Sequence, residues 1–318
     1  MSFSSTIKDE LIRLPDEKAC CRKVEIAGIL RTGLMLRKYH DVSSIIFITE
    51  HAPLSRYIFS SIKSYIETGP NIFGEKTTRF KKHVVYRLNF NKILCIEGFK
   101  QFFHSIGINA NLDEGKIIYN DYEITDRCCM RAYIRGGFLA VGSITSPEKA
   151  YHLELSFADK KIALEYMSFM KLFDLKPKHL TRKGYEIVYM KEGQDIVDFL
   201  NVIGAHQALM NMENIRILKD MRNQVNRIVN CETANLGKTV NASLKQVEYI
   251  KSIENTIGIE NLPRGLKEIA RLRLEFPEAS LSELGNMLTP PLGKSGVNHR
   301  LRKLEKIADN KKQDFFGK

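Results

Sequence analysis

The chain has 318 residues, with 49 Lys and Arg against 37 Asp and Glu, which gives a formal net charge of +12. Hydrophobic residues make up 43% of it, too many for a disordered chain, and its size suits two or three modest folded domains. No run reaches the roughly 18 to 20 apolar residues of a membrane span, and the polar start lacks the apolar core of a signal peptide. The composition therefore predicts a soluble, cytoplasmic protein without membrane association, and the basic charge favours a polyanionic partner.

An internal repeat occupies the first two thirds of the chain. The segment from Cys20, CCRKVEIAGILRTGLML, corresponds to the segment from Cys128, CCMRAYIRGGFLAVGSI, at a constant offset of 108 residues. The same offset relates two sets of apolar residues with helical spacing, Leu54, Ile58, Ile62 and Tyr65 in the first segment and Ile162, Tyr166, Met170 and Phe173 in the second. We therefore predict two halves that are built alike.

Each half is predicted to run helix, strands, helix, strand, helix. The Cys-Cys helix comes first, and strands follow at 45–48 in the first half and at 151–157 in the second. After the second helix come one strand, at 84–88 and 185–189 respectively, and a last helix. The polar stretch 109–126, with its Asn, Asp and Gly residues, is interpreted as a connector between the halves.

The two Cys-Cys helices carry the small-residue steps Ala27-Gly28 and Gly136-Gly137, which cost helix propensity and indicate that the helices cross closely. Such a crossing would bring two pairs of thiols together, which is one route to a zinc site. Adjacent cysteines, however, lack the C-x₂-C spacing that lets two thiolates reach one tetrahedral ion. We therefore favour buried thiols beside a tight helix contact, and expect no metal and no cofactor.

Three short helices are predicted between residue 262 and the C-terminus. Ser280 and Glu283 form a capping box that begins the second of them, and Pro290-Pro291 end it. The third begins near Lys294 and turns four apolar residues to the core, Val297, Leu301, Leu304 and Ile307. This organisation is typical of a helix-turn-helix, whose last helix enters the major groove of DNA.

The third helix carries the candidate DNA contacts, with seven Lys and Arg against two acids between residues 294 and 312. Asn298 is suited to pair with adenine, and Arg300 or Lys294 with guanine, whereas the later cations suit phosphates. The predicted DNA-binding residues are Lys294, Ser295, Asn298, His299, Arg300, Arg302, Lys303 and Lys306. The alternatives are a helical bundle with a basic face and, for His299, an ordinary surface histidine.

The repeated helices resemble the paired motif helices of LAGLIDADG homing endonucleases, in segments 26–33 and 134–141. The resemblance implies an α+β fold, a pseudo-twofold duplicated αββαβα domain whose two sheets make a saddle for DNA. In those nucleases an acidic residue near the end of each motif helix holds divalent metals. Those positions are Gly33 and Val141 here, and no Asp or Glu lies nearby along the helices. Metal-dependent cleavage is therefore not expected.

Basic residues recur near the same strands of both halves. They are Lys76, Arg79, Lys81, Lys82 and His83 in the first half and Lys176, Lys178, His179, Arg182 and Lys183 in the second. On a saddle they would face DNA phosphates, and the alternative is a solvated sheet surface. Charge alone leaves both interpretations open.

Longer strings identify the chain as similar to the WhiA family of bacterial sporulation and cell-division regulators. They are both Cys-Cys helices, NRIVNCETANLGKTV, and LPRGLKEIARLRLEFPEASLSELGNMLTPPLGKSGVNHRLRKLEKIA. The resemblance implies a catalytically inactive nuclease-like scaffold followed by an all-α helix-turn-helix domain. The expected domains are 1–108 and 109–210 for the two LAGLIDADG-like halves, 211–260 for a helical linker and 261–318 for the helix-turn-helix.

The resemblance also implies a function. A family member is expected to regulate transcription in cell division, chromosome segregation and, in some hosts, sporulation. Its partners would be double-stranded promoter DNA and RNA polymerase or another regulator, and it would be nucleoid-associated. The alternatives are an adaptor of the nucleoid or division machinery that binds DNA nonspecifically and, with less support, an active homing-type endonuclease.

Overall fold

The structure of the chain is a computed structural model that describes residues 2–14, 18–39, 42–77, 83–112 and 114–316. Contacts divide the chain into two compact units, Met1–Lys219 and Asp220–Lys318. Within the described ranges, no helix is both long and apolar enough to cross a membrane.

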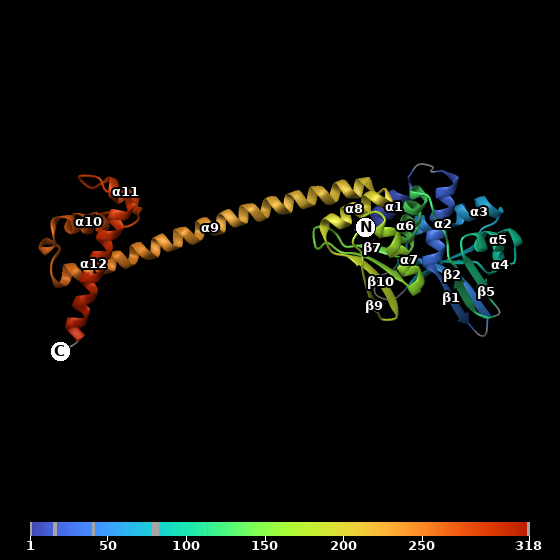
Figure 1. Cartoon of the computed structure of the whole chain (residues 1–318). Coiled ribbons are helices and arrows are strands. Elements are labelled where there is room, and N and C mark those ends of the chain that lie inside the picture. Colours follow the sequence, from blue (N-terminus) through green and yellow to red (C-terminus); the bar gives the residue numbers. More distant parts are fainter. Residues whose placement is uncertain (1, 15–17, 40–41, 78–82, 113, 317–318) are drawn as a thin grey trace. The chain divides into compact units, whose positions relative to one another are not determined.

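The first half of the N-terminal unit combines helices with one antiparallel sheet (Figure 1). Its elements are α1 (Phe3–Ile12), α2 (Ala19–Gly33), β1 (Leu34–Tyr39), β2 (Val42–Thr49), α3 (Ala52–Ile66), β3 (Asn71–Thr77), β4 (His83–Asn89), α4 (Asn91–Leu94) and α5 (Glu97–Ser105). The strand order is β1-β2-β4-β3. Alternate residues of the two central strands, such as Phe47 and Leu88, are paired in register and buried in the core.

The second half repeats this plan. Its elements are α6 (Arg127–Val141), β7 (Gly142–Ile144), β8 (Leu153–Phe157), α7 (Lys160–Lys171), β9 (Lys178–Arg182), β10 (Tyr185–Met190) and α8 (Gly193–Ile203). The sheet order β7-β8-β10-β9 corresponds strand for strand to that of the first half. The bounds of α2 and α6 differ by 108 residues at both ends, so the predicted duplication is confirmed.

The predicted order within each half misses one strand. β3 and β9 are edge strands, and each pairs with only one neighbour, β4 or β10. Most residues of β9 are exposed, so no alternation of apolar and polar residues marks it in the sequence. The αββαβα order of each half is therefore corrected to αββαββα.

The stretch 109–126, interpreted from sequence as a connector, contains most of a small hairpin. β5 (Ile108–Asn111) pairs antiparallel with β6 (Lys116–Tyr119). Gly115 precedes β6 with a φ of +60°, a conformation that glycine adopts without strain. Only alternate residues of β6 are half-buried, which is too short a pattern to predict a strand from sequence.

The two halves meet where α2 packs against α6 (Figure 1). A Cβ atom on Gly136 would lie 2.2 Å from the carbonyl oxygen of Glu25, and one on Gly28 would lie 2.5 Å from that of Tyr133. Each glycine therefore lets its helix touch the backbone of the other. The close crossing predicted from the small residues is confirmed.

A buried arginine of α2 connects the halves next to this crossing. The Arg31 side chain has no exposed surface, and it donates to the Tyr133 hydroxyl and to the Glu165 carboxylate, both at 2.8 Å. It also donates to three backbone carbonyl oxygens, those of Ile106, Gly107 and Asn120. The guanidinium thus satisfies its donors within the interface, as a buried charge requires.

A second arginine forms the reciprocal connection from α6. Arg135 Nε lies 2.5 Å from the Glu25 carboxylate, which accepts a second hydrogen bond, 2.6 Å long, from the Tyr57 hydroxyl. Tyr133 donates to Glu165 in the other network. Residues 25 and 133 are equivalent at the 108-residue offset, and so are 57 and 165. Tyrosine and glutamate have therefore exchanged places between the halves.

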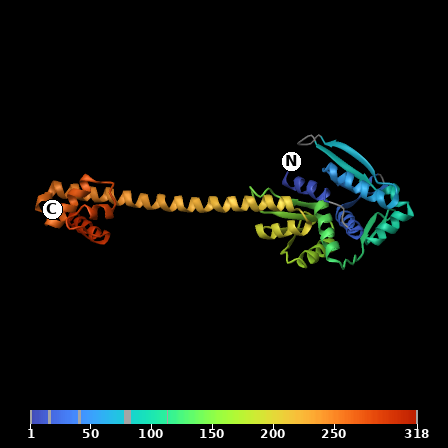
Figure 2. The same cartoon turned by 90° about the horizontal axis from the view of Figure 1, so that it is seen from above.

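The C-terminal unit is helical. α9 (His206–Thr256) begins in the N-terminal unit and continues into this one as an uninterrupted helix (Figure 2). It is followed by η1 (Ile259–Asn261), α10 (Arg264–Glu275), α11 (Leu281–Asn286) and α12 (Lys294–Phe316). Residues from α9 to α12 share one core, which includes Ile250, Ile253, Ile269, Leu284, Val297 and Leu304. The three helices predicted after residue 262 are confirmed.

Gly136→Ala is expected to destabilise the N-terminal unit by about 1 to 3 kcal/mol, because the new Cβ would overlap the backbone of Glu25. Gly98→Ala is the matched control, since the nearest atom to its new Cβ lies at an ordinary contact distance of 3.8 Å. Urea unfolding of both full-length variants measures the difference. Equal midpoints for the two variants would contradict the backbone contact.

Arg31→Met is expected to cost about 3 to 5 kcal/mol, because it leaves the half-buried Glu165 carboxylate and three carbonyl groups without their donor. Arg87→Met is the control. Its exposed pair with Glu75, at 2.8 Å, should contribute less than about 1 kcal/mol. Adding Glu165→Gln to Arg31→Met should recover part of the loss in a double-mutant cycle. Additive losses in that cycle would show that the pair is not coupled.

Candidate nucleic-acid interface

The second helix of the C-terminal unit begins at the predicted capping box. Ser280 Oγ accepts from the Glu283 amide at 3.3 Å, and the Glu283 carboxylate accepts from the Ser280 amide at 2.7 Å. The hydrogen bonds from Ser280 lower the pKa of Glu283, so the carboxylate is the stable form. This reciprocal pair fixes the start of α11 and confirms the sequence prediction.

The turn between α11 and α12 is closely packed. The Leu292 amide donates to the Gly285 carbonyl at 3.0 Å, and a Cβ on Gly285 would lie 2.0 Å from the Leu292 carbonyl oxygen. Ile307, predicted in the core, is half-buried. Between residues 294 and 310, the buried side chains of α12 are Val297, Leu301, Leu304 and Ala308. α12 is therefore fixed against α10 and α11 along one side only.

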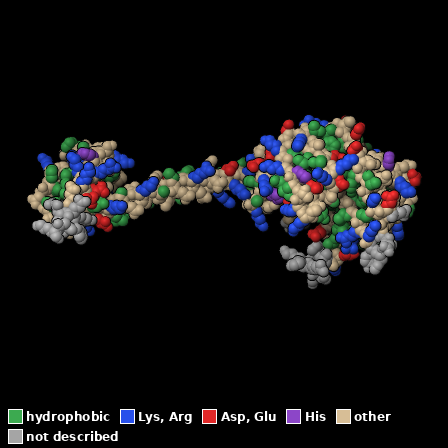
Figure 3. Space-filling model, turned by 60° about the horizontal axis from the view of Figure 1, so that its bottom comes forward, with side chains coloured by type: hydrophobic (Ala, Val, Ile, Leu, Met, Phe, Trp, Pro, Cys, Tyr) green, Lys and Arg blue, Asp and Glu red, His purple; other side chains and the backbone are tan. Residues whose placement is uncertain are grey.

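The other side of α12 is exposed and basic. The predicted contact residues that are exposed are Lys294, Ser295, His299, Arg302, Lys303 and Lys306. Asn298 is half-buried at the margin of this surface. Helical spacing places 295, 299, 302 and 306 opposite the buried residues. Figure 3 shows basic side chains over the C-terminal unit. A helix held on one side and basic on the other can enter a DNA groove.

Arg300 lies elsewhere than the sequence prediction placed it. It is half-buried and its Nη1 donates to the Gly265 carbonyl of α10 at 3.1 Å. Its guanidinium carbon would be 3.1 Å from a Cβ on Gly265, so the group lies flat against the α10 backbone. In this conformation Arg300 fixes α12 to α10 and does not extend toward a base with the exposed residues.

Arg273, which was not predicted from the sequence, is a structural residue of the same unit. It is buried, and its Nη1 donates to the carbonyl oxygens of Ala279 at 2.6 Å and Pro277 at 3.1 Å. Burial lowers the pKa of Arg273. These bonds hold the loop that leads into α11. Helical spacing could have indicated that Arg273 is buried, because residue 273 falls on the same helix face as Leu266 and Ile269.

On the sheets of the N-terminal unit, several basic residues are paired with glutamates. Arg87 contacts Glu75 at 2.8 Å, and Arg182 contacts Glu154 at the same distance. The exposed lysines predicted near these strands are Lys76, Lys176, Lys178 and Lys183, and His179 is bonded to Glu186. Arg79, Lys81 and Lys82 lie outside the described residues, and His83 begins β4. Acidic and basic side chains are interspersed over the face of this unit that Figure 3 shows.

The positions of the nuclease acids lie at the C-terminal ends of α2 and α6. A Cβ on Gly33 would lie 2.1 Å from the ring of Phe47, so there is no space for an acidic side chain. Val141 is half-buried. Among the described residues, the one cluster of three or more potential metal ligands consists of cysteines and contains no carboxylate. The oxygen ligands that Mg²⁺ requires are not assembled at these two positions.

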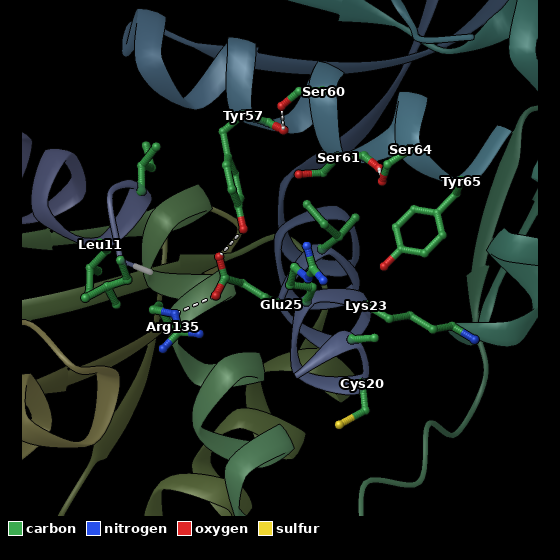
Figure 4. Close-up of a pocket in the computed structure, with 15 residues that line it drawn as sticks. Leu11, Cys20, Lys23, Glu25, Tyr57, Ser60, Ser61, Ser64, Tyr65 and Arg135 are labelled. Carbon is green, nitrogen blue, oxygen red and sulfur yellow. Dashed lines mark hydrogen bonds and ion pairs between the residues drawn. The ribbon is translucent and has the colours of Figure 1, made fainter. Parts of the chain in front are cut away.

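A pocket of about 770 Å³ opens beside the N-terminal part of α2 (Figure 4). In Figure 4, Glu25 lies between Tyr57 and Arg135, and three serines of α3 line the wall above it, Ser60, Ser61 and Ser64. Burial and the Glu25 carboxylate raise the pKa of Tyr57, which keeps its hydroxyl a donor. The Glu25 carboxylate is bonded within the network between the halves, and we assign it a structural role.

Comparisons with known domains cover most of the chain. A WhiA N-terminal LAGLIDADG-like domain matches residues 19–96, a WhiA LAGLIDADG-like domain matches residues 130–222, and a WhiA C-terminal HTH domain matches residues 225–308. These matches correspond to the two halves and to the helix-turn-helix, and the last begins within α9.

Relatives match over nearly the full length. The probable cell division protein WhiA of Ruminiclostridium cellulolyticum is 46% identical over 309 residues, which are 97% of each chain. That of Alkaliphilus metalliredigens is 44% identical and covers 98% of this chain and 99% of its own. The crystal structure of full-length DUF199/WhiA from Thermatoga maritima has a TM-score of 0.57 at 25% identity and covers 98% of this chain and 99% of its own. The chain therefore belongs to the WhiA family, with a duplicated LAGLIDADG-like unit and a helix-turn-helix.

Proposed function

We propose that the chain is a sequence-specific DNA-binding regulator of transcription, acting in cell division, chromosome segregation and, in hosts that form spores, sporulation. The observation that carries this proposal is the exposed basic face of α12, held against α10 and α11 by an apolar core on its opposite side. The proposed sites are promoter sequences in double-stranded DNA. RNA polymerase or another regulator is the proposed protein partner, and the place of action is the nucleoid in the cytoplasm.

The exposed residues suggest a division of roles along α12. Lys294, Ser295, Asn298 and His299 lie in its first two turns, where a recognition helix contacts base edges. Arg302, Lys303 and Lys306 follow and would neutralise phosphates on either side of the groove. Arg300 is assigned a positioning role, because its guanidinium bonds to α10.

The LAGLIDADG-like unit is proposed to act as a scaffold without nuclease activity. Gly33 and Val141 provide no metal ligand, and Phe47 fills the space beside Gly33. The neutral pairing of Arg87 and Arg182 with glutamates leaves the sheets a weak contact to DNA.

An adaptor of the nucleoid or division machinery is the second candidate. Large apolar side chains on α9 are about half exposed or more, which favours a protein partner along this helix: Met221, Val225, Ile228, Val229, Leu236, Val240 and Leu244. An adaptor would bind DNA without sequence preference, so the two candidates differ in how binding responds to the DNA sequence.

The double substitution Lys303→Ala and Lys306→Ala is expected to weaken binding to all DNA sequences alike. Two lost phosphate contacts should reduce the slope of log K against log salt by about 2. Fluorescence anisotropy over a range of salt concentrations measures that slope. Lys178→Ala with Lys183→Ala removes the same charge from the sheet unit and should leave the slope unchanged. A matching drop in this control would place the phosphate contacts on the sheets.

The double substitution Ser295→Ala and Asn298→Ala is expected to reduce sequence preference, with a loss of about 1 to 3 kcal/mol at specific sites and little change elsewhere. Genome-wide crosslinking of the native protein and the variant measures it, and Asn109→Ala, exposed on β5, is the control. Sharp peaks upstream of genes should disappear only in the α12 variant. Diffuse occupancy that is the same in wild type and variant would reject promoter reading and favour the adaptor.

A further inference from the structure

Three cysteine sulfurs meet at the end of the α2–α6 interface opposite the nuclease positions, and a fourth cysteine is their neighbour in sequence. Cys20 and Cys21 lie in the first turn of α2, and Cys128 and Cys129 lie in the first turn of α6. The sulfur atoms of Cys20, Cys21 and Cys129 all lie within 4.8 Å of one another. The sulfur of Cys128 is not among these three, but Cys128 precedes Cys129 in α6 as Cys20 precedes Cys21 in α2, so it is the candidate fourth member. We call these four residues the cysteine cluster.

The spacing of the three grouped sulfurs is close to that of a tetrahedral thiolate site. A Zn–S bond of about 2.3 Å places neighbouring sulfurs about 3.8 Å apart. The Cys20 and Cys21 sulfurs are 4.0 Å apart, although the residues are adjacent in the sequence. Adjacent thiols can therefore lie close to one another, and the crossing of α2 and α6 brings the Cys129 sulfur to the same place.

The surroundings suit a negatively charged centre. Both cysteine pairs lie at helix N-termini, where the helix dipole favours thiolates. Basic residues flank them in sequence, with Lys18, Arg22 and Lys23 around the first pair and Arg127 and Arg131 around the second. A tetrathiolate zinc centre has a net charge of −2, which these groups would offset.

Two members of the cysteine cluster are exposed and two are buried. Cys20 lines the pocket described above, and Cys128 lines another, of about 580 Å³, so both openings give an ion access to the cluster. Cys21 and Cys129 are buried. Burial raises the pKa of Cys129 to about 12 and raises that of Cys21 further still. Without an ion, these two groups are neutral thiols.

We propose that the cysteine cluster binds one Zn²⁺ ion through four thiolates, two from each half, with the Cys128 side chain turning toward the three sulfurs that already lie together. Binding forms four Zn–S bonds and releases four protons to solvent, with no change of oxidation state. The soft sulfur donors select zinc over Mg²⁺ or Ca²⁺. The site lies at the opposite end of α2 and α6 from Gly33 and Val141, so it is separate from the metal positions of the nucleases. It fastens the N-terminal ends of the two interface helices together.

The test uses the full-length chain, reduced, stripped of metal with a chelator, and titrated with Zn²⁺ alone. Mass spectrometry of the intact protein should show one zinc per chain. Zn²⁺ should raise the melting temperature by mass action, and binding should strengthen as pH rises because the thiols must lose protons. Co²⁺ in place of Zn²⁺ should give the visible bands of tetrahedral cobalt and a thiolate-to-metal charge-transfer band.

Matched variants separate the cysteine cluster from other thiols. Cys20→Ala with Cys128→Ala removes two exposed members and should abolish stoichiometric binding and the cobalt spectrum, without changing the melting temperature of the metal-free protein. Cys95→Ala with Cys231→Ala removes two exposed cysteines outside the cluster and should change neither the zinc stoichiometry nor the cobalt spectrum. Zinc binding that survives the first pair of substitutions would overturn the proposal. The proposal would also be overturned if the reduced wild-type chain bound no zinc. The same holds if mild oxidation gave a disulfide among these cysteines and the reduced chain showed no metal binding.

Discussion

The backbone contact between α2 and α6 is the constraint on which the N-terminal unit depends. Gly28 and Gly136 each lie against the main chain of the opposite helix, so neither position has space for a side chain. Helices that approach this closely leave no room between them for large apolar residues. Beside the crossing, two arginine networks connect the halves through long side chains that reach from one half to the other, and a single apolar core extends through both halves.

Burying the charged groups of these networks costs free energy unless every donor and acceptor finds a partner. An arginine or glutamate taken out of water must recover its hydration through hydrogen bonds and an opposite charge. Arg31 does so with one carboxylate, one phenol and three carbonyl groups, and Arg135 with the carboxylate of Glu25 as its ion-pair partner. The same arrangement specifies how the halves pair, because a shift of one helix turn would leave both guanidinium groups without acceptors. Specificity, more than net stability, is what buried ion pairs of this kind can contribute.

The sequence predicted those parts of the fold that depend on local pattern. The repeat, the small-residue steps and the capping box at Ser280 were each readable from a few neighbouring residues. Edge strand β9 was not, because its residues face solvent on both sides. The contact of Arg300 could not be predicted either. Helical spacing gives the side of α12 that a residue occupies, but not the backbone carbonyl that its side chain reaches. The thiol separations likewise depend on how two helices cross.

The exchange of tyrosine and glutamate between the halves has a consequence for how this interface can change. Each network needs one acid, one phenol and one guanidinium, yet the acid is on α2 in one network and on α7 in the other. Replacing Tyr57 alone by glutamate would place two carboxylates, those of residues 25 and 57, beside the single guanidinium of Arg135. Replacing Glu25 alone by tyrosine would leave Arg135 without its counter-ion. Only paired replacement preserves the interface. The residue that suits position 25 thus depends on the residue at position 57, and the same holds for 133 and 165, so the two halves differ in sequence here while their chemistry stays the same.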